Sequence, residues 1–181
     1  MALFIYGMNC WFLMLMYRLN HLKAAQNHQQ IKNRFYQNVP SQQWPCVTIQ
    51  LPIYNERYVV ERLIESVCRI DYPRNLLEVQ VLDDSTDDTV QIARAMVAKM
   101  KTAGVDIVYA HRAERSGFKA GALKEGLKTA KGSLLAVFDA DFIPDPDFLM
   151  ESVPYFQDPQ IGMLQTRWGH INSDYSLLTR A

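Results

Sequence analysis

Short apolar runs separated by helical stretches make up most of the chain after residue 45. Four β-rich runs, at residues 46–51, 79–82, 105–109 and 134–138, predict strands. Between them, apolar residues recur three or four positions apart, which predicts three helices. The helical stripes are Val60, Leu63, Ile64 and Val67; Ala93, Met96, Val97 and Met100; and Ala120, Leu123, Leu127 and Ala130. Such alternation indicates βαβ units and a mainly parallel sheet covered by helices.

The first 17 residues, MALFIYGMNCWFLMLMY, form an apolar run without a charged side chain. At 1.5 Å per residue, a helix of this length reaches roughly 25 Å, the short end of what spans a hydrocarbon core. A signal peptide would need basic residues before the run and a small-residue cleavage site after it. A buried hydrophobic helix is the other alternative. We predict a membrane helix over residues 1–18.

The charge is distributed unevenly, although the 19 basic and 19 acidic side chains of the 181-residue chain sum to zero. This sum argues against a nucleic-acid binder with a uniformly basic surface. The first acidic residue is Glu56, so the first 55 residues carry +4 and the other 126 carry −4 (15 basic against 19 acidic). The basic residues after the apolar run predict that the body lies in the cytoplasm, at the cell membrane.

Three segments follow from these patterns. The membrane helix over 1–18 leads to a basic polar linker over 19–45, which ends near Pro40 and Pro45, and an interfacial helix over residues 20–38 is the alternative. The α/β domain occupies 46–181.

Polar side chains gather where the predicted strands end. The group comprises Tyr54 and Glu56 after the first strand, Asp83 and Asp84 after the second, Arg112, Arg115 and Lys119 after the third, and Asp139 and Asp141 after the fourth. Open parallel sheets bind ligands beyond the carboxyl ends of their strands. We therefore expect these side chains to line one rim.

Asp139 and Asp141 are separated by one small residue directly after an apolar strand. In extended backbone, side chains two positions apart point the same way, so both carboxylates can face one hard cation. Such a pair suits Mg²⁺ or Mn²⁺ that also binds phosphate oxygens, although a solvated acidic loop is the alternative. Lys119 and the arginines before it are candidates to neutralise a diphosphate on the opposite side.

Several phosphate-binding signatures are missing from the sequence. Neither GxxxxGK[ST] nor GxGxxG occurs, which disfavours an NTPase and a nicotinamide dehydrogenase. A phosphate ligand held by a metal ion and a lysine is what remains.

Five segments resemble the inverting, membrane-embedded family 2 glycosyltransferases, in the branch that contains cellulose synthases and mannan synthases. They are QLPIYNE (50–56), VLDDSTDDT (81–89), RSGFKAGALKEGL (115–127), FDADF (138–142) and MLQTRW (163–168). They occur in the family's order and cover roughly residues 47–181. The resemblance implies a Rossmann-like, glycosyltransferase A type α/β fold with helices on both faces of the sheet, preceded by one N-terminal membrane helix.

The resemblance also implies roles for individual residues. The implied donor-binding residues are Tyr54 and Glu56 around the base, Asp83 and Asp84 at the nucleoside, and Lys119 and Asp139 at the diphosphate. Asp139 and Asp141 would hold Mg²⁺ or Mn²⁺, and Gln165, Arg167 and Trp168 would lie on the acceptor side. The implied reaction is metal-dependent, inverting transfer of a hexose from UDP-glucose or GDP-mannose to a growing β-linked polysaccharide.

Two family motifs are missing. The Thr-Glu-Asp tripeptide that supplies the general base does not occur, and residues 165–168 are one residue too short for Gln-X-X-Arg-Trp. We therefore expect the donor-binding part of a longer enzyme, truncated at its C-terminus. The alternatives are a membrane-anchored, non-catalytic nucleotide- or metal-binding module, an inactive fragment, and a soluble response-regulator-like domain, which the apolar N-terminus disfavours.

Overall fold

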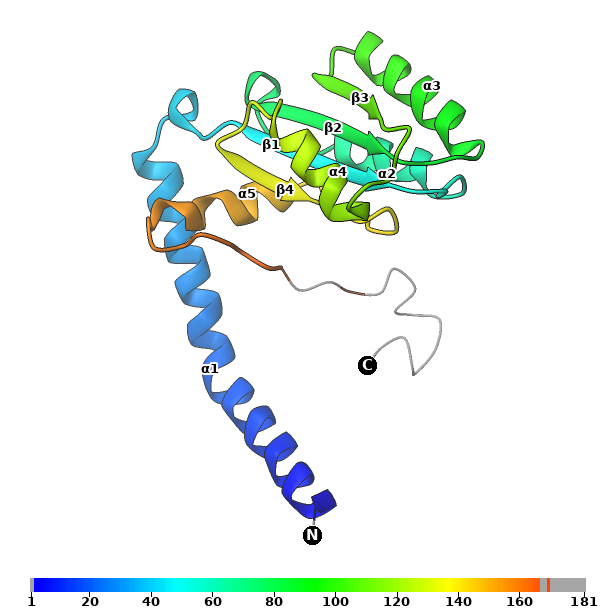
Figure 1. Ribbon diagram of the computed structural model, residues 1–181. Helices are drawn as coiled ribbons and strands as arrows, with labels where there is room; N and C mark the ends of the chain where they lie inside the picture. The colour runs from blue at the N-terminus through cyan, green and yellow to red at the C-terminus, as the bar shows by residue number, and fades with distance from the viewer. Residues whose placement is uncertain (1, 167–168, 170–181) are drawn as a thin grey trace.

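Four parallel strands form one sheet in a computed structural model of the chain, which describes residues 2–166 and 169. The strands are β1 (Val47–Ile53), β2 (Leu77–Asp83), β3 (Ile107–His111) and β4 (Leu134–Val137), in the order β3-β2-β1-β4 (Figure 1). All three strand pairs are parallel. The predicted α/β class and mainly parallel sheet are confirmed.

The strand order places a topological switch point beside β1. The chain moves outward from β1 to β2 and β3, and then returns to the other side of β1 to form β4. In open α/β sheets, ligands bind at such a reversal, beyond the carboxyl ends of the strands. Ile53 lies level with Asp83 in the β1–β2 register, so these two strands end at the same height.

Helices cover both faces of the sheet. Helices α2 (Val60–Cys68) and α3 (Thr89–Thr102) pack against each other on one face, and α4 (Phe118–Leu127) lies on the opposite face. A short helix, α5 (Phe148–Ser152), follows β4. The 3₁₀ helices are η1 (Ser41–Gln43), η2 (Arg74–Leu76) and η3 (Val153–Gln157).

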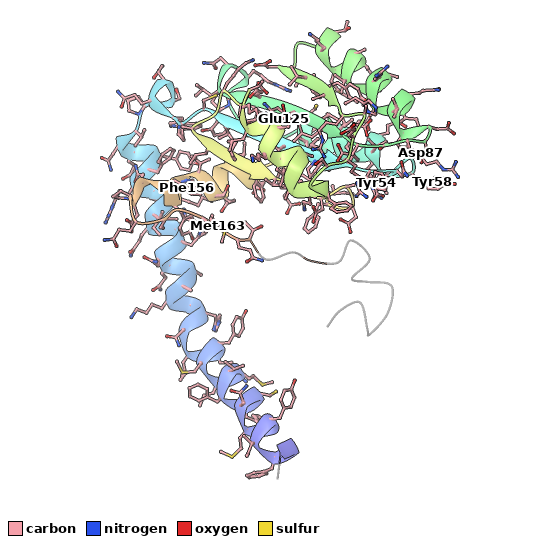
Figure 2. The ribbon with its side chains drawn as sticks, in the orientation of Figure 1. Tyr54, Tyr58, Asp87, Glu125, Phe156 and Met163 are labelled. Carbon is pink, nitrogen blue, oxygen red and sulfur yellow. The ribbon has the colours of Figure 1, made fainter. Side chains whose placement is uncertain are left out.

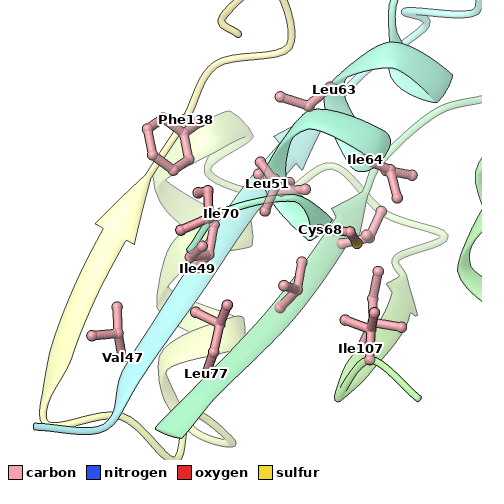
Figure 3. Close-up of a cluster of buried hydrophobic side chains, with 14 of the residues drawn as sticks. Val47, Ile49, Leu51, Leu63, Ile64, Cys68, Ile70, Leu77, Ile107 and Phe138 are labelled. Carbon is pink, nitrogen blue, oxygen red and sulfur yellow. The ribbon is translucent and has the colours of Figure 1, made fainter. Parts of the chain in front are cut away.

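The apolar core lies between the sheet and α2. Alternate residues of β1, including Val47, Ile49 and Leu51, point to this face, where Leu63 and Ile64 of α2 are fully buried against them (Figure 3). Side chains two positions apart on the strand thus pack against one face of a helix with 3.6 residues per turn. All four residues of the predicted α2 stripe are buried, which confirms that stripe.

The opposite face of the sheet carries a polar ladder, which comprises Thr48 and Gln50 of β1 and Glu78 and Gln80 of β2. The Thr48 hydroxyl donates a 2.7 Å hydrogen bond to Glu78, and the Gln50 amide donates a 3.0 Å hydrogen bond to Gln80. All four residues are buried. Because each polar group has a partner, the ladder can be covered by a helix without leaving unsatisfied donors.

Helix α4 covers this ladder with small residues, Ala122 and Gly126. The predicted stripe of Ala120, Leu123, Leu127 and Ala130 is therefore wrong, since Leu127 is 56% exposed. A flat layer of hydrogen-bonded side chains leaves room only for a helix face without bulky groups.

Helix α1 (Ala2–Asn38) is a single 37-residue helix that projects from the body (Figures 1 and 2). Within the described part of the chain, no helix has both the length and the apolar character that crossing a membrane requires. The membrane helix predicted over residues 1–18 is thus not supported. The apolar run passes without a break into Arg18, Asn20 and His21 of the same helix. Residues 20–38, for which a linker and an interfacial helix were the alternatives, form the second half of this helix.

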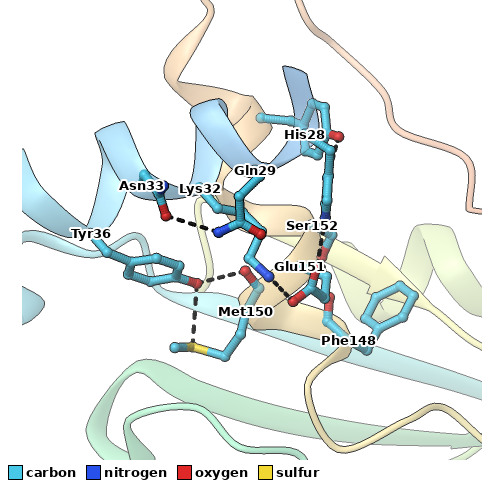
Figure 4. Close-up of polar contacts among 10 residues, drawn as sticks. His28, Gln29, Lys32, Asn33, Tyr36, Phe148, Met150, Glu151 and Ser152 are labelled. Atoms are coloured by element: carbon cyan, nitrogen blue, oxygen red, sulfur yellow. Dashed lines mark hydrogen bonds and ion pairs between the residues drawn. The ribbon is translucent and has the colours of Figure 1, made fainter. Parts of the chain in front are cut away.

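The C-terminal part of α1 is joined to α5 by polar contacts (Figure 4). His28 Nε2 lies 2.6 Å from Glu151 Oε2, and Lys32 forms an ion pair with the same carboxylate. These contacts, that of Lys32 first, lower the pKa of Glu151. The Tyr36 hydroxyl donates a 2.5 Å hydrogen bond to a backbone carbonyl of α5, and Phe35 is buried in the core. Residues 28–38 therefore pack as part of the α/β body, which begins before residue 46.

A side chain at Gly126 should disrupt the packing of α4 on the polar ladder. A Cβ atom there would lie 2.7 Å from Gln50 Nε2 and 2.9 Å from Gln80 Oε1. We expect Gly126→Val to lower the free energy of unfolding by about 2 kcal/mol. Leu127→Val, on the exposed side of the same helix, should change it by less than about 0.5 kcal/mol. Urea unfolding measures both, and equal losses would contradict the packing described.

Candidate functional site

The loops that follow β1 and β2 are fastened to each other. The backbone N–H of Asn55 donates to Ser85 Oγ at 2.9 Å, and the N–H of Thr86 donates to Asn55 Oδ1 at 2.9 Å. Asn55 has a φ of 57°, a left-handed conformation that asparagine tolerates better than most residues. The ends of two adjacent strands thus form one continuous edge. These two hydrogen bonds were not predicted from the sequence. The one sequence signal for them is the tolerance of asparagine at position 55 for a left-handed conformation.

Asp83 supports this edge from beneath. Its carboxylate is fully buried and accepts hydrogen bonds from the Ser85 N–H at 2.8 Å and from the Tyr109 hydroxyl at 2.5 Å. Burial, followed by the hydrogen bond to Asp83, raises the pKa of Tyr109. The structure therefore places Asp83 below the rim, where it fixes the loop that carries the next residue.

Asp84 forms a bidentate ion pair with Arg112. Arg112 Nε lies 2.7 Å from Asp84 Oδ1, and Arg112 Nη2 lies 2.5 Å from Oδ2. Asp84 is only 5% exposed. The hydrogen bond to Asp84 raises the pKa of Arg112. Arg112, a candidate diphosphate ligand in the sequence, is instead paired with the Asp84 carboxylate in the structure.

The same guanidinium organises the cationic loop, which we define as residues 112–118, from the end of β3 to the first residue of α4. Arg112 donates to the carbonyl oxygens of Ser116 at 3.0 Å and Phe118 at 3.1 Å. Phe118 is exposed and has a φ of 51°, a strained conformation for an aromatic residue. The ion pair at the end of β2 thus holds the backbone that leads to Lys119.

Gly121 allows this loop to lie directly on the first turn of α4. A Cβ atom at this position would lie 2.0 Å from the Ser116 carbonyl oxygen and 2.8 Å from Arg112 Nη1. No other residue fits without displacing the loop. Close backbone approach therefore explains the glycine in the KAG sequence after residue 118.

The side chains of Arg115 and Tyr54 stack on each other at the rim. The Arg115 guanidinium carbon lies 3.4 Å from the Tyr54 ring centroid, a cation–π geometry. Tyr54 is 38% exposed and lies at the edge of the body with Tyr58 and Asp87 (Figure 2). Glu56, in the same loop, is exposed. The stacked pair offers a planar surface to a ligand.

Asp139 and Asp141 follow β4 in a turn closed by a hydrogen bond from the Phe142 N–H to the Asp139 carbonyl at 3.0 Å. The extended backbone predicted for this pair is wrong, because β4 ends at Val137. Both carboxylates are nevertheless exposed, and Lys119 forms an ion pair with Asp139 across the rim.

Two carboxylates are too few ligands for a hard divalent cation, which would need further oxygen ligands from a bound substrate. Among the described residues, no group of three His, Cys, Asp or Glu side chains is arranged to hold a metal ion. Mg²⁺ and Mn²⁺ are commonly bound by one or two carboxylates together with phosphate oxygens of a substrate. The donor set of Asp139 and Asp141 matches that mode.

Gln165 is the one predicted acceptor-side residue that the structure describes. Gln165 is exposed in the irregular segment after η3 and forms no hydrogen bond to the rim within the described structure. Arg167 and Trp168 lie outside the described residues.

The rim therefore combines a stacking surface, an anchored anion–cation pair, a lysine at a helix N-terminus and two exposed carboxylates. Comparison with protein families gives a match to the description "Glycosyl transferase family 2" over residues 48–181. The chain belongs to glycosyl transferase family 2.

Curated relatives in this family include plant enzymes. The chain is 44% identical over 145 residues to "Glucomannan 4-beta-mannosyltransferase 2" of Arabidopsis thaliana, a match that covers 77% of this chain and 27% of the relative. It is 44% identical over 142 residues to "Glucomannan 4-beta-mannosyltransferase 1" of Oryza sativa, which covers 76% and 27%. The chain thus spans about a quarter of the length of these relatives.

Solved structures share the fold. The mannosyltransferase PcManGT from Pyrobaculum calidifontis, in complex with GDP-Man and Mn²⁺, aligns with a TM-score of 0.61 and 30% identity, over 78% of this chain and 44% of that chain. S. aureus TarS 1–349 aligns with a TM-score of 0.54 and 20% identity, over 68% and 39%. The predicted Rossmann-like, glycosyltransferase A type fold is confirmed.

Proposed function

We propose that the chain is the donor-binding part of a mannosyltransferase, which transfers a mannosyl group from GDP-mannose to a growing β-linked polysaccharide. The observation that carries this proposal is the rim of Lys119, Asp139 and Asp141, in a chain 44% identical to glucomannan mannosyltransferases. The sequence left UDP-glucose and GDP-mannose open. The named activity of the relatives favours GDP-mannose.

The nucleoside would bind between the ends of β1 and β2. Tyr54, stacked on Arg115, offers a flat face to the base, with Glu56 beside it. Asp84, held by Arg112, would accept hydrogen bonds from the nucleoside, while buried Asp83 keeps the loop in place. A prearranged acceptor lowers the ordering cost of binding.

The diphosphate would bind at the N-terminus of α4. Lys119 lies in the first turn of that helix, where the ammonium group and the helix dipole both favour an anion. Asp139 and Asp141 would hold Mg²⁺ or Mn²⁺ against the phosphate oxygens. When bound, the metal stabilises the negative charge that develops on the leaving nucleoside diphosphate.

The transfer itself would invert the anomeric centre. An acceptor hydroxyl forms the new bond to the anomeric carbon as the bond to the diphosphate oxygen breaks, and a general base takes the hydroxyl proton. We assign no base among residues 1–181. Gln165, Arg167 and Trp168 remain the proposed acceptor-side residues.

Calorimetric titration of the 181-residue chain tests donor binding. We expect GDP-mannose with Mn²⁺ to bind more tightly than UDP-glucose with Mn²⁺. The double variant Asp139→Asn with Asp141→Asn should weaken GDP-mannose binding at least about tenfold, since one charge-assisted metal contact is worth about 1.4 kcal/mol or more.

Asp145→Asn is the matched control, because Asp145 is an exposed acid a few residues further along the same segment. It should leave the affinity unchanged. Binding of GDP-mannose that is independent of both rim aspartates, or no binding by a folded sample, would contradict the proposal.

We also propose that the chain works at the cytoplasmic face of a cell membrane. Large apolar side chains of α1, such as Trp11 and Phe12, are exposed, and Arg18 and Lys23 follow them. An apolar surface flanked by basic residues suits the interface of an anionic bilayer.

Vesicle flotation tests this second proposal. The chain should float with vesicles that contain anionic lipid, and Trp11→Asp with Phe12→Asp should reduce the floated fraction several-fold. Met163→Asp, at an exposed apolar residue outside α1, should have no effect. A chain that stays with the soluble fraction whatever the lipid would refute membrane association.

A further inference from the structure

In this structure Lys119 and Asp139 form an ion pair with each other. In the proposed function, Lys119 would instead bind a diphosphate and Asp139 a metal ion. The ammonium group of Lys119 forms an ion pair with Asp139 Oδ1. Within the described structure, Asp141 has no ion pair and stays exposed. One of the two carboxylates that suit a divalent cation is thus already occupied by a positive charge of the chain itself.

The ion pair is accessible and easily exchanged. The side chains of Lys119 and Asp139 are 50% and 49% exposed, so water reaches both groups. Exposed ion pairs of this kind contribute little to stability, and a competing ligand can displace either partner at low cost.

Lys119 is held in place by the cationic loop, whereas its ammonium group is free to change partner. Arg112 fixes the carbonyl oxygens of Ser116 and Phe118, immediately before Lys119. The first turn of α4 contains no acidic residue that could neutralise the lysine locally. Within the described structure, the anionic partner of the Lys119 ammonium group is therefore Asp139, on the other side of the rim.

We propose that Lys119 is an exchangeable counter-ion of Asp139, which makes a divalent metal ion and a nucleoside diphosphate bind cooperatively. This inference rests on the proposed function, because it assumes that Asp139 takes the metal and Lys119 the diphosphate. A metal ion that binds first must compete with the ammonium group for Asp139. A diphosphate that attracts the ammonium group frees that carboxylate, and by linkage the metal strengthens diphosphate binding by the same factor.

Titration of Mn²⁺ into the full 181-residue chain, followed by the electron paramagnetic resonance signal of free Mn²⁺, tests the inference. The titration is performed with and without saturating GDP. For the unmodified chain, GDP should strengthen Mn²⁺ binding about tenfold or more, because it supplies phosphate oxygens and withdraws Lys119.

Replacing the lysine separates this effect from the supply of phosphate ligands. Lys119→Met should strengthen Mn²⁺ binding without GDP by about 3- to 20-fold, since one positive charge leaves the vicinity of a divalent cation. The enhancement by GDP should shrink by a similar factor. Lys119→Arg keeps the charge and should leave Mn²⁺ binding without GDP as weak as in the unmodified chain.

Lys124→Met is the matched control, because Lys124 is an exposed lysine on the same helix without an ion-pair partner in the described structure. It should change neither titration. Unchanged or weaker Mn²⁺ binding by Lys119→Met without GDP overturns the inference while leaving the proposed function intact. No Mn²⁺ binding by the unmodified chain even with GDP, or binding that survives Asp139→Asn, overturns the proposed metal site itself.

Discussion

The bidentate contact between Asp84 and Arg112 is the interaction on which the geometry of the rim depends. It joins the end of β2 to the loop after β3, and the remaining donors of Arg112 fix two carbonyl oxygens of the cationic loop. Lys119 follows directly. An arginine suits this position because its planar, rigid fork satisfies a carboxylate and two carbonyls at once, which a lysine cannot do.

The sheet provides the frame that this contact requires. Equal register of β1 and β2 brings their ends to one height, and the Asn55–Ser85 contact closes the edge between them. On the far face, α4 approaches the polar ladder closely because Gly126 has no side chain. The position of Lys119 at the start of α4 is therefore set by contacts along the whole helix, as well as by the loop before it.

The sequence predicted most of the fold, because periodicity depends on local order, whereas the roles of the rim residues stay predictions. The stripe of α2 faces apolar neighbours and was predicted correctly. That of α4 was wrong, since its partner, the polar ladder, comes from two other strands. The partner of Arg112 depends on tertiary geometry that residue type alone does not reveal, and the turn at Asp139 depends on where β4 stops pairing with β1.

A double-mutant cycle on the free energy of unfolding tests most directly whether the Asp84–Arg112 contact organises the rim. Asp84→Asn, Arg112→Met and their combination are compared with the unmodified chain by urea unfolding. Because Asp84 is nearly buried, we expect a coupling energy of about 2 kcal/mol, so that the double variant is destabilised by about 2 kcal/mol less than the sum of the two single variants. A coupling energy below about 0.5 kcal/mol, as for exposed ion pairs, would contradict it.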